Sequence, residues 1–148
     1  MKAKYSIGID LHKSVIQVCV LDEGGEVIEE FRESIETLEL GMAVVGWLTK
    51  WRDGGRLVVE AVGVNRSFVN ACQEAGLGIV VADPVKLNLQ MLGRKTDRRD
   101  AKELARRLYL GDIDAYATTY YPTEDEYGVR KVLRVRHHLV KVRQQITS

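Results

Sequence analysis

The sequence predicts an α/β domain built on a mixed sheet, because short apolar runs and helical periods follow one another in a particular order. Three strand-like runs come first, at residues 5–10, 15–21 and 26–32, with Gly24 and Gly25 in the turn between the second and third. Helical patterns then alternate with further apolar runs. This order predicts an antiparallel meander that continues into parallel strands joined by helices.

Each later element has its own signal. The expected elements are a helix at about 37–51, a strand at 56–60, a helix at about 65–75, a strand at 77–82 and a helix from Pro84. Thr37 is a suitable N-cap, Gly76 a suitable stop, and proline is favoured at a first helical position. Three antiparallel strands followed by parallel crossovers is the chain order of a ribonuclease-H-like sheet, whereas a doubly wound nucleotide-binding sheet alternates from the start.

Composition indicates one ordinary soluble domain. The chain has 148 residues, of which 45% are hydrophobic and 29% charged, and a chain of this length buries about 68–70% of its unfolded surface. We expect no membrane contact and no signal peptide, because no run approaches the ~18 apolar residues of a span. Cys19 and Cys72 each lie among apolar neighbours, so we expect buried reduced thiols and a cytoplasmic protein.

The net charge of +1 conceals an asymmetry. Residues 1–92 hold nine Lys/Arg and 13 Asp/Glu, whereas residues 93–148 hold 13 Lys/Arg and eight Asp/Glu. A basic second part is typical of proteins with a polyanionic partner, although solvated helix faces have the same composition.

Carboxylates stand at the ends of two predicted buried strands. Asp10 ends the first strand and Glu60 ends the strand at 56–60, where ligands of open α/β sheets bind. Asp97 and Asp100 are three residues apart, at the predicted start of a helix that runs to about Leu110, and share one helical face. Acids in a first helical turn also bond free N–H groups and favour the helix dipole, so capping alone explains this pair too.

Four carboxylates at one sheet edge would repel one another unless cations lay among them. Hard divalent ions prefer oxygen ligands, and two of them about 3.5–4 Å apart can clamp a phosphate during in-line displacement. The spacing therefore permits a site for Mg²⁺ or Mn²⁺.

Three segments resemble the DEDD transposases, insertion-sequence recombinases related to the Piv and MooV invertases. They lie at residues 8–13, 59–63 and 93–101, and the last contains a Lys-Thr-Asp-x-x-Asp-Ala block. The resemblance covers essentially the whole chain, including residues 134–140, which look like the family's linker helix. Val62 and Asp83 stand where the family usually has Thr and Asn, and neither is one of the four acids.

The resemblance implies a RuvC-like catalytic domain at residues 1–118 and the start of a basic coiled-coil linker helix at 119–148. The catalytic metal ligands that it implies are Asp10, Glu60, Asp97 and Asp100. The implied activity is metal-dependent DNA cleavage and strand exchange in transposition or site-specific inversion, guided in some members by a structured RNA. Family members continue into a second domain with a serine nucleophile, which no serine here matches, so we expect the amino-terminal part of a recombinase.

Basic side chains surround the predicted site and continue into the tail, where they suit a polyanion. The candidate nucleic-acid contacts are Lys13, Arg94, Lys95, Arg98, Arg99, Arg134, Arg136, Lys141 and Arg143. Solvated charge explains any one of them as well. His12 is either a turn residue or a group that reaches a metal or a phosphate.

The tail has the pattern of a coiled coil. Thr123 and Glu126 have the spacing of a capping box. The apolar seam steps by 3, 4, 3 and 4 through Val132, Val135, Leu139, Val142 and Ile146. This predicts a homo-oligomer formed through the last helix; the alternative is a helix packed back on its own domain.

Two other functions remain open from the sequence. An actin-like kinase or ATPase also has a first strand that ends in Gly-x-Asp, but it needs a phosphate-gripping Gly/Thr-rich turn where residues 11–13 are Leu-His-Lys. A non-catalytic scaffold that binds nucleic acid would use the four acids only as caps.

Overall fold

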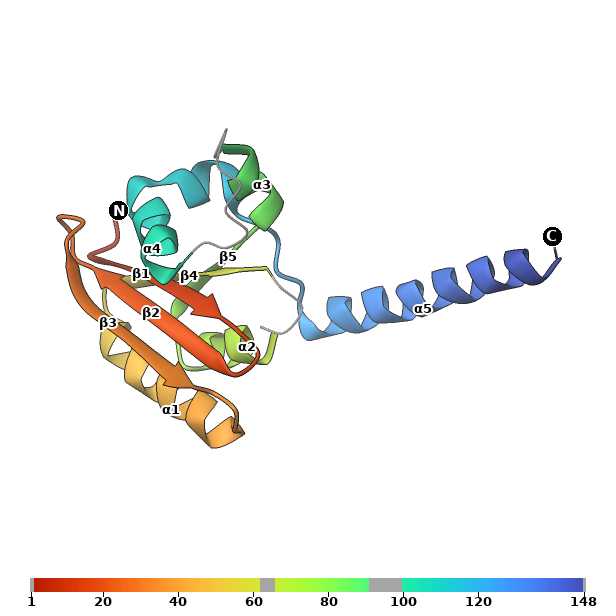
Figure 1. The fold of residues 1–148 in the computed structure, drawn as a ribbon, viewed down its shortest axis with the longest axis horizontal. Coiled ribbons are helices and arrows are strands. Elements are labelled where there is room, and N and C mark those ends of the chain that lie inside the picture. The colour runs from red at the N-terminus through yellow and green to blue at the C-terminus, as the bar shows by residue number, and fades with distance from the viewer. Residues whose placement is uncertain (1, 62–65, 91–99, 148) are drawn as a thin grey trace.

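Five strands form one mixed sheet in the order β3-β2-β1-β4-β5 (Figure 1). The structure is a computed structural model that describes residues 2–61, 66–90 and 100–147. The strands are β1 (Tyr5–Leu11), β2 (Val15–Leu21), β3 (Val27–Ser34), β4 (Gly55–Glu60) and β5 (Gly78–Ala82). The first three pair antiparallel, whereas β4 pairs parallel with both β1 and β5. The predicted ribonuclease-H-like order is therefore confirmed.

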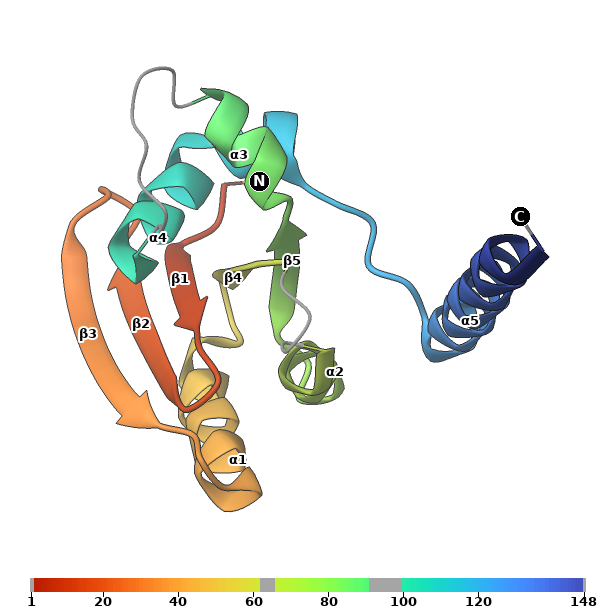
Figure 2. The same ribbon diagram turned by 45° about the vertical axis from the view of Figure 1, so that its right-hand side comes forward.

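Helices cover both faces of the sheet (Figure 2). They are α1 (Leu38–Leu48), its 3₁₀ extension η1 (Thr49–Trp51), α2 (Arg66–Glu74), α3 (Pro84–Gln90), α4 (Ala101–Leu110), the π-helical turn η2 (Ile113–Ala117) and α5 (Glu124–Thr147). Side chains of α1 and α2 pack with Ile7 and Ile9 of β1 on one face. On the other face, α3, α4 and η2 pack with Val58 of β4.

The position of α4 depends on a glycine in β1. A Cβ atom at Gly8 would overlap the carbonyl oxygen of Ala101 and the amide nitrogen of Ala105. Glycine in a strand permits such a close backbone approach. The first turn of α4 therefore lies directly against β1, two residues before Asp10.

Local signals in the sequence predict most element ends. The Thr37 side chain accepts a hydrogen bond from the Leu40 amide at 3.2 Å, and Gly76 ends α2 with a φ of 77°, as a left-handed stop requires. The predicted helix start near Asp97 is wrong. α4 begins at Ala101, because Asp100 has extended backbone (φ −79°, ψ 169°) and serves as the N-cap.

The last helix projects away from the rest of the molecule (Figures 1 and 2). Every residue from 128 to 147 is exposed, so α5 beyond its first turn does not pack back on its own domain. Thr123 caps it by accepting from the Glu126 amide at 3.3 Å. Among the helices of the described residues, none is long and apolar enough to cross a membrane.

The two thiols are buried, as predicted. Burial raises the pKa of each to about 12, so neither is a thiolate near neutral pH.

Candidate functional site

Asp10 and Glu60 occupy adjacent positions on neighbouring parallel strands. The register of β1 and β4 runs through the pair Ile9 and Val59, and Asp10 and Glu60 follow directly on their strands. Because side chains alternate along a strand, Asp10 lies on the face of Gly8, and Glu60 on the face of Val58. That is the face covered by α4. Neighbouring strands are about 4.7–4.9 Å apart, so the two carboxylates belong to one edge.

Asp100 approaches the same face from α4. Its Oδ1 atom accepts a hydrogen bond from the Glu103 amide at 2.8 Å, and the next residue, Ala101, lies over Gly8. Cys19 of β2 pairs with Gly8 across the sheet. Asp100 therefore lies beside the β1–β2 pair.

The predicted carboxylate set is only partly described. Asp97 lies outside the described residues, and so do Arg94, Lys95, Arg98 and Arg99. Within residues 2–61, 66–90 and 100–147, no group of three or more His, Cys, Asp and Glu side chains is arranged to hold a metal ion. The donor chemistry nevertheless fits Mg²⁺, because Asp10, Glu60 and Asp100 offer carboxylate oxygens at one face of the sheet.

His12 contacts the Asp10 carboxylate directly. Its Nε2 atom is 2.9 Å from Oδ2 of Asp10, and its backbone N–H donates to the Val15 carbonyl at 2.8 Å. His12 is thus a turn residue, as one of the two interpretations predicts. The sequence analysis did not predict this side-chain contact. The spacing of two residues between Asp10 and His12 at the end of a strand could have indicated it.

The comparisons with known proteins agree with the motifs. The family model for DEDD transposases of the IS110 type, described as a transposase, matches residues 7–148. The chain belongs to this family. The match confirms the resemblance inferred from the motifs and, with the sheet order, the assignment to an enzyme family with a RuvC-like DEDD domain. Members of this family are typically metal-dependent.

Two curated relatives are similar to this chain over nearly all of its length. It is 27% identical over 143 residues to the transposase for insertion sequence element IS1533 of Leptospira borgpetersenii, covering 94% of this chain and 40% of that protein. It is 24% identical over 148 residues to the transposase for insertion sequence element IS1111A of Coxiella burnetii (strain RSA 493 / Nine Mile phase I), covering 100% of this chain and 38% of that protein. The chain thus spans about two-fifths of the length of these relatives.

A solved structure of T. thermophilus RuvC in complex with Holliday junction substrate also matches. The TM-score is 0.46 at 12% sequence identity, over 78% of this chain and 99% of that one.

The predicted basic contacts of the chain fall into two places. Lys13 is exposed in the turn after β1, three residues beyond Asp10. The other described candidates lie on the projecting helix α5 and are all exposed: Arg134, Arg136, Lys141 and Arg143. The structure therefore brings Lys13, but not the α5 cations as a group, to the carboxylate edge.

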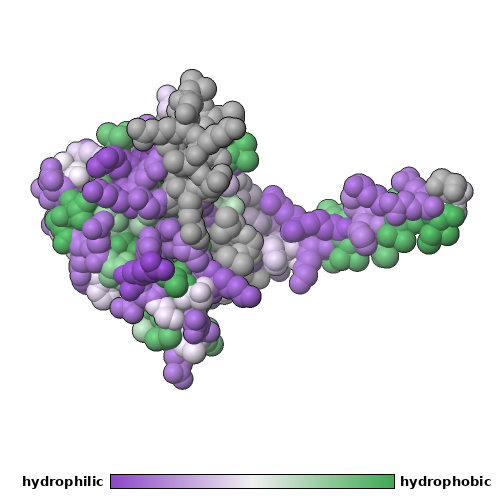
Figure 3. Space-filling model, viewed as in Figure 1, coloured by the Kyte–Doolittle hydropathy of each residue, from purple (hydrophilic) through white to green (hydrophobic). Residues whose placement is uncertain are grey.

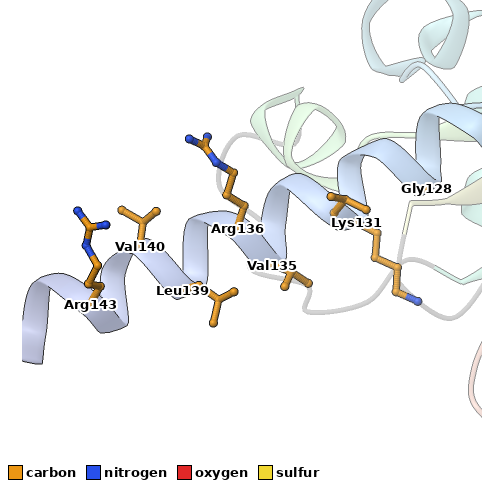
Figure 4. Close-up of a pocket in the computed structure, with 8 residues that line it drawn as sticks. Gly128, Lys131, Val135, Arg136, Leu139, Val140 and Arg143 are labelled. Atoms are coloured by element: carbon orange, nitrogen blue, oxygen red, sulfur yellow. The ribbon is translucent and has the colours of Figure 1, made fainter.

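One side of α5 is apolar (Figure 3). Val132, Val135 and Leu139 line a shallow groove along it, and the close-up shows Val135 and Leu139 pointing away from Arg136 and Arg143 (Figure 4). Lys131, Arg136 and Arg143 border the same groove, and charged residues commonly flank the apolar seam of a coiled coil.

Proposed function

We propose that this transposase domain binds Mg²⁺ or Mn²⁺ through Asp10, Glu60, Asp97 and Asp100 and contributes that site to DNA cleavage and strand exchange. The observation that carries the proposal is the adjacency of Asp10 and Glu60 on the face where α4 brings Asp100 to β1. Asp97 is included in the proposed site only because of its position in the Lys-Thr-Asp-x-x-Asp-Ala block.

The residues of the chain orient oxygen donors around the place where a phosphate would be held. β1 and β4 hold Asp10 and Glu60 side by side, and the capped start of α4 holds Asp100. A bound divalent cation would supply Lewis-acid polarisation of a phosphate oxygen. His12 restrains one oxygen of Asp10, and Lys13 suits a neighbouring phosphate of the backbone.

The remaining parts of the reaction follow from the family resemblance. There the attacking hydroxyl belongs to a serine of a second domain, and the carboxylates of residues 1–118 act together with it. Residues 119–148 would form the linker helix, which pairs with a second copy of the chain and binds DNA. In some family members the helix would bind a structured guide RNA instead. The exposed cations and apolar seam of α5 suit both tasks.

Calorimetry of metal binding tests the proposal. The chain should bind Mn²⁺ and Mg²⁺, and Asp10→Asn or Glu60→Gln should weaken binding at least tenfold. Asp53→Asn is the matched control, because Asp53 is an exposed acid in the turn before β4. Mn²⁺ should also raise the melting temperature of the unsubstituted chain by mass action, and of Asp10→Asn much less.

One observation favours the non-catalytic scaffold as a second candidate. Asp100 is the N-cap of α4, which is the role that a scaffold would give to each acid. A scaffold predicts no carboxylate-dependent metal binding. Equal Mn²⁺ affinities for the unsubstituted chain, Asp10→Asn and Glu60→Gln would therefore favour the scaffold and reject the metal site.

A further inference from the structure

A hollow of about 360 Å³ lies on the α2 side of the sheet, between the end of β4 and the beginning of α5. Ala61, which directly follows Glu60, lines one side, and Arg66 of α2 lines another. The segment at 119–122 contributes Tyr120 and Tyr121. Tyr127, Arg130 and Arg134 complete it from α5, where spacings of three and four residues place them on one helical face. The hollow is therefore built from segments far apart in the sequence.

The inner wall of the hollow is held by Arg66. Its guanidinium carbon lies 3.9 Å from the centroid of the Tyr127 ring and 5.2 Å from that of Tyr121. Its Nη2 group donates to the Pro122 carbonyl at 3.2 Å, and the Tyr121 hydroxyl donates to the Arg66 carbonyl at 3.2 Å. These contacts pre-organise the rings before any ligand binds.

Tyr120 is the exposed ring of the hollow. It is 63% exposed, yet its hydroxyl donates to the Glu126 carboxylate at 2.6 Å, which fixes the side chain. The Arg130 guanidinium lies 5.9 Å from the ring centroid. A fixed, exposed aromatic ring beside a cation is the usual platform on which proteins stack an unpaired base.

The charge of the lining selects among ligands. Three of the described lining residues are arginines and none is acidic, so an anionic ligand is favoured. An uncharged peptide would use the rings but would offer no anion to Arg130 or Arg134. A nucleotide satisfies both, because its base stacks on an aromatic face and its phosphates pair with guanidinium groups.

We propose that this hollow receives an unpaired nucleotide, with the base stacked on Tyr120 and the adjoining phosphates on Arg130 and Arg134. The inference rests on the proposed function, because strand exchange requires an unpaired strand. The hollow lies on the α2 side of the sheet, whereas Glu60 lies on the α4 side. The nucleotide comes either from a DNA strand opened near the carboxylates or from an RNA strand. Both present the same base and phosphate chemistry.

Fluorescence anisotropy in EDTA tests the proposal without metal or cleavage. The 148-residue chain is titrated with a short single strand and with the same backbone lacking every base, each as DNA and as RNA. Loss of the bases should weaken binding about five- to 150-fold, the factor that corresponds to one stacked base. The sugar type with the larger base-dependent factor identifies the source of the strand. Equal affinity for the strands with and without bases would overturn the proposal.

Variants separate stacking from structure. Tyr120→Ala should lose the preference for the base-bearing strand, whereas Tyr120→Phe should keep it, since the ring remains and only the hydroxyl contact to Glu126 is lost. Tyr116→Ala, which removes a similarly exposed tyrosine (64%) of η2 outside the hollow, should keep the preference. If Tyr120→Phe behaves like Tyr120→Ala, the ring has no stacking role. Metal binding measured separately by calorimetry shows whether the proposed function fails at the same time.

Discussion

The Nε2 atom of His12 lies 2.9 Å from Oδ2 of Asp10 at the edge where β1 ends. The backbone N–H of His12 donates to the Val15 carbonyl and closes the turn into β2. This hydrogen bond fixes the main chain that carries the imidazole ring. The Asp10 side chain is 13% exposed, and a contact of this kind limits its rotation. A group that orients a ligating carboxylate is a common outer partner of metal ligands.

Replacing His12 should therefore weaken metal binding indirectly. We expect His12→Ala to lower Mn²⁺ affinity by about 10- to 100-fold, the usual effect of removing an outer-shell partner. Calorimetry measures it, with His137→Ala on α5 as the matched control. Unchanged Mn²⁺ affinity in His12→Ala would show that the contact with Asp10 has no positioning role.

Gly8→Ala should destabilise the fold. The added methyl group would overlap backbone atoms of Ala101 and Ala105, and backbone cannot move aside as a flexible side chain can. We expect the free energy of unfolding to fall by ~1–3 kcal/mol, as measured by urea denaturation. Gly46→Ala is the control, because nothing lies within 4 Å of a Cβ at that helical position; it should stabilise by up to ~1 kcal/mol. Equal stability of Gly8→Ala and the unsubstituted chain would mean that α4 does not lie against β1.

The ion pair between Arg56 and Asp114 should make stability depend on pH. Arg56 donates two hydrogen bonds to the Asp114 carboxylate, at 2.6 and 2.7 Å, and these hold the pKa of that carboxyl below its usual range. A depressed pKa in the folded state adds stability above the unfolded pKa of about 3.9, and this is lost as the pH falls through the lower folded value. Both side chains are more than one-third exposed, so the pair contributes only about 0.5–1 kcal/mol.

Asp114→Asn tests this pair. The variant should be less stable than the unsubstituted chain at pH 7 by about that amount, and the difference should shrink as the pH falls below about 4. Asp125→Asn, an exposed acid of α5, is the control. A difference that persists unchanged into acid would assign the effect to something other than the charge of Asp114.

Substitution within the α5 seam should reduce self-association. Leu139 is 61% exposed and belongs to the 3-4 seam, and a second copy would bury it. We expect Leu139→Lys to raise the dissociation constant of the oligomer at least tenfold in sedimentation equilibrium. Leu133→Lys is the matched control, because Leu133 is 54% exposed but lies off the seam. Equal effects of the two substitutions would reject the coiled coil.

Much of the architecture follows from local sequence signals. β2 (Val15–Leu21) has the predicted bounds, because its apolar run is bounded by polar and glycine turns that no distant contact overrides. The start of α4 does not follow from the pattern. The apolar period from Ala101 to Leu108 predicts a start near Asp97, but Asp100 has extended backbone and caps a helix that begins at Ala101, the residue that meets Gly8.

The sequence by itself determined the order of the elements along the chain and which carboxylates end its strands, since a strand's burial period and the residue at its end are local properties. The ribonuclease-H-like fold predicts that Asp10 and Glu60 end adjacent strands, and the register of β1 and β4 confirms it. Only the tertiary structure decided that His12 turns toward Asp10 and that α5 projects from the domain beyond its first turn. The same holds for the hollow beyond the end of β4, whose walls come from residues 61 to 134. The physical reason is that these relationships depend on the register between strands and on helix placement, and both are set by packing between segments that are distant along the chain.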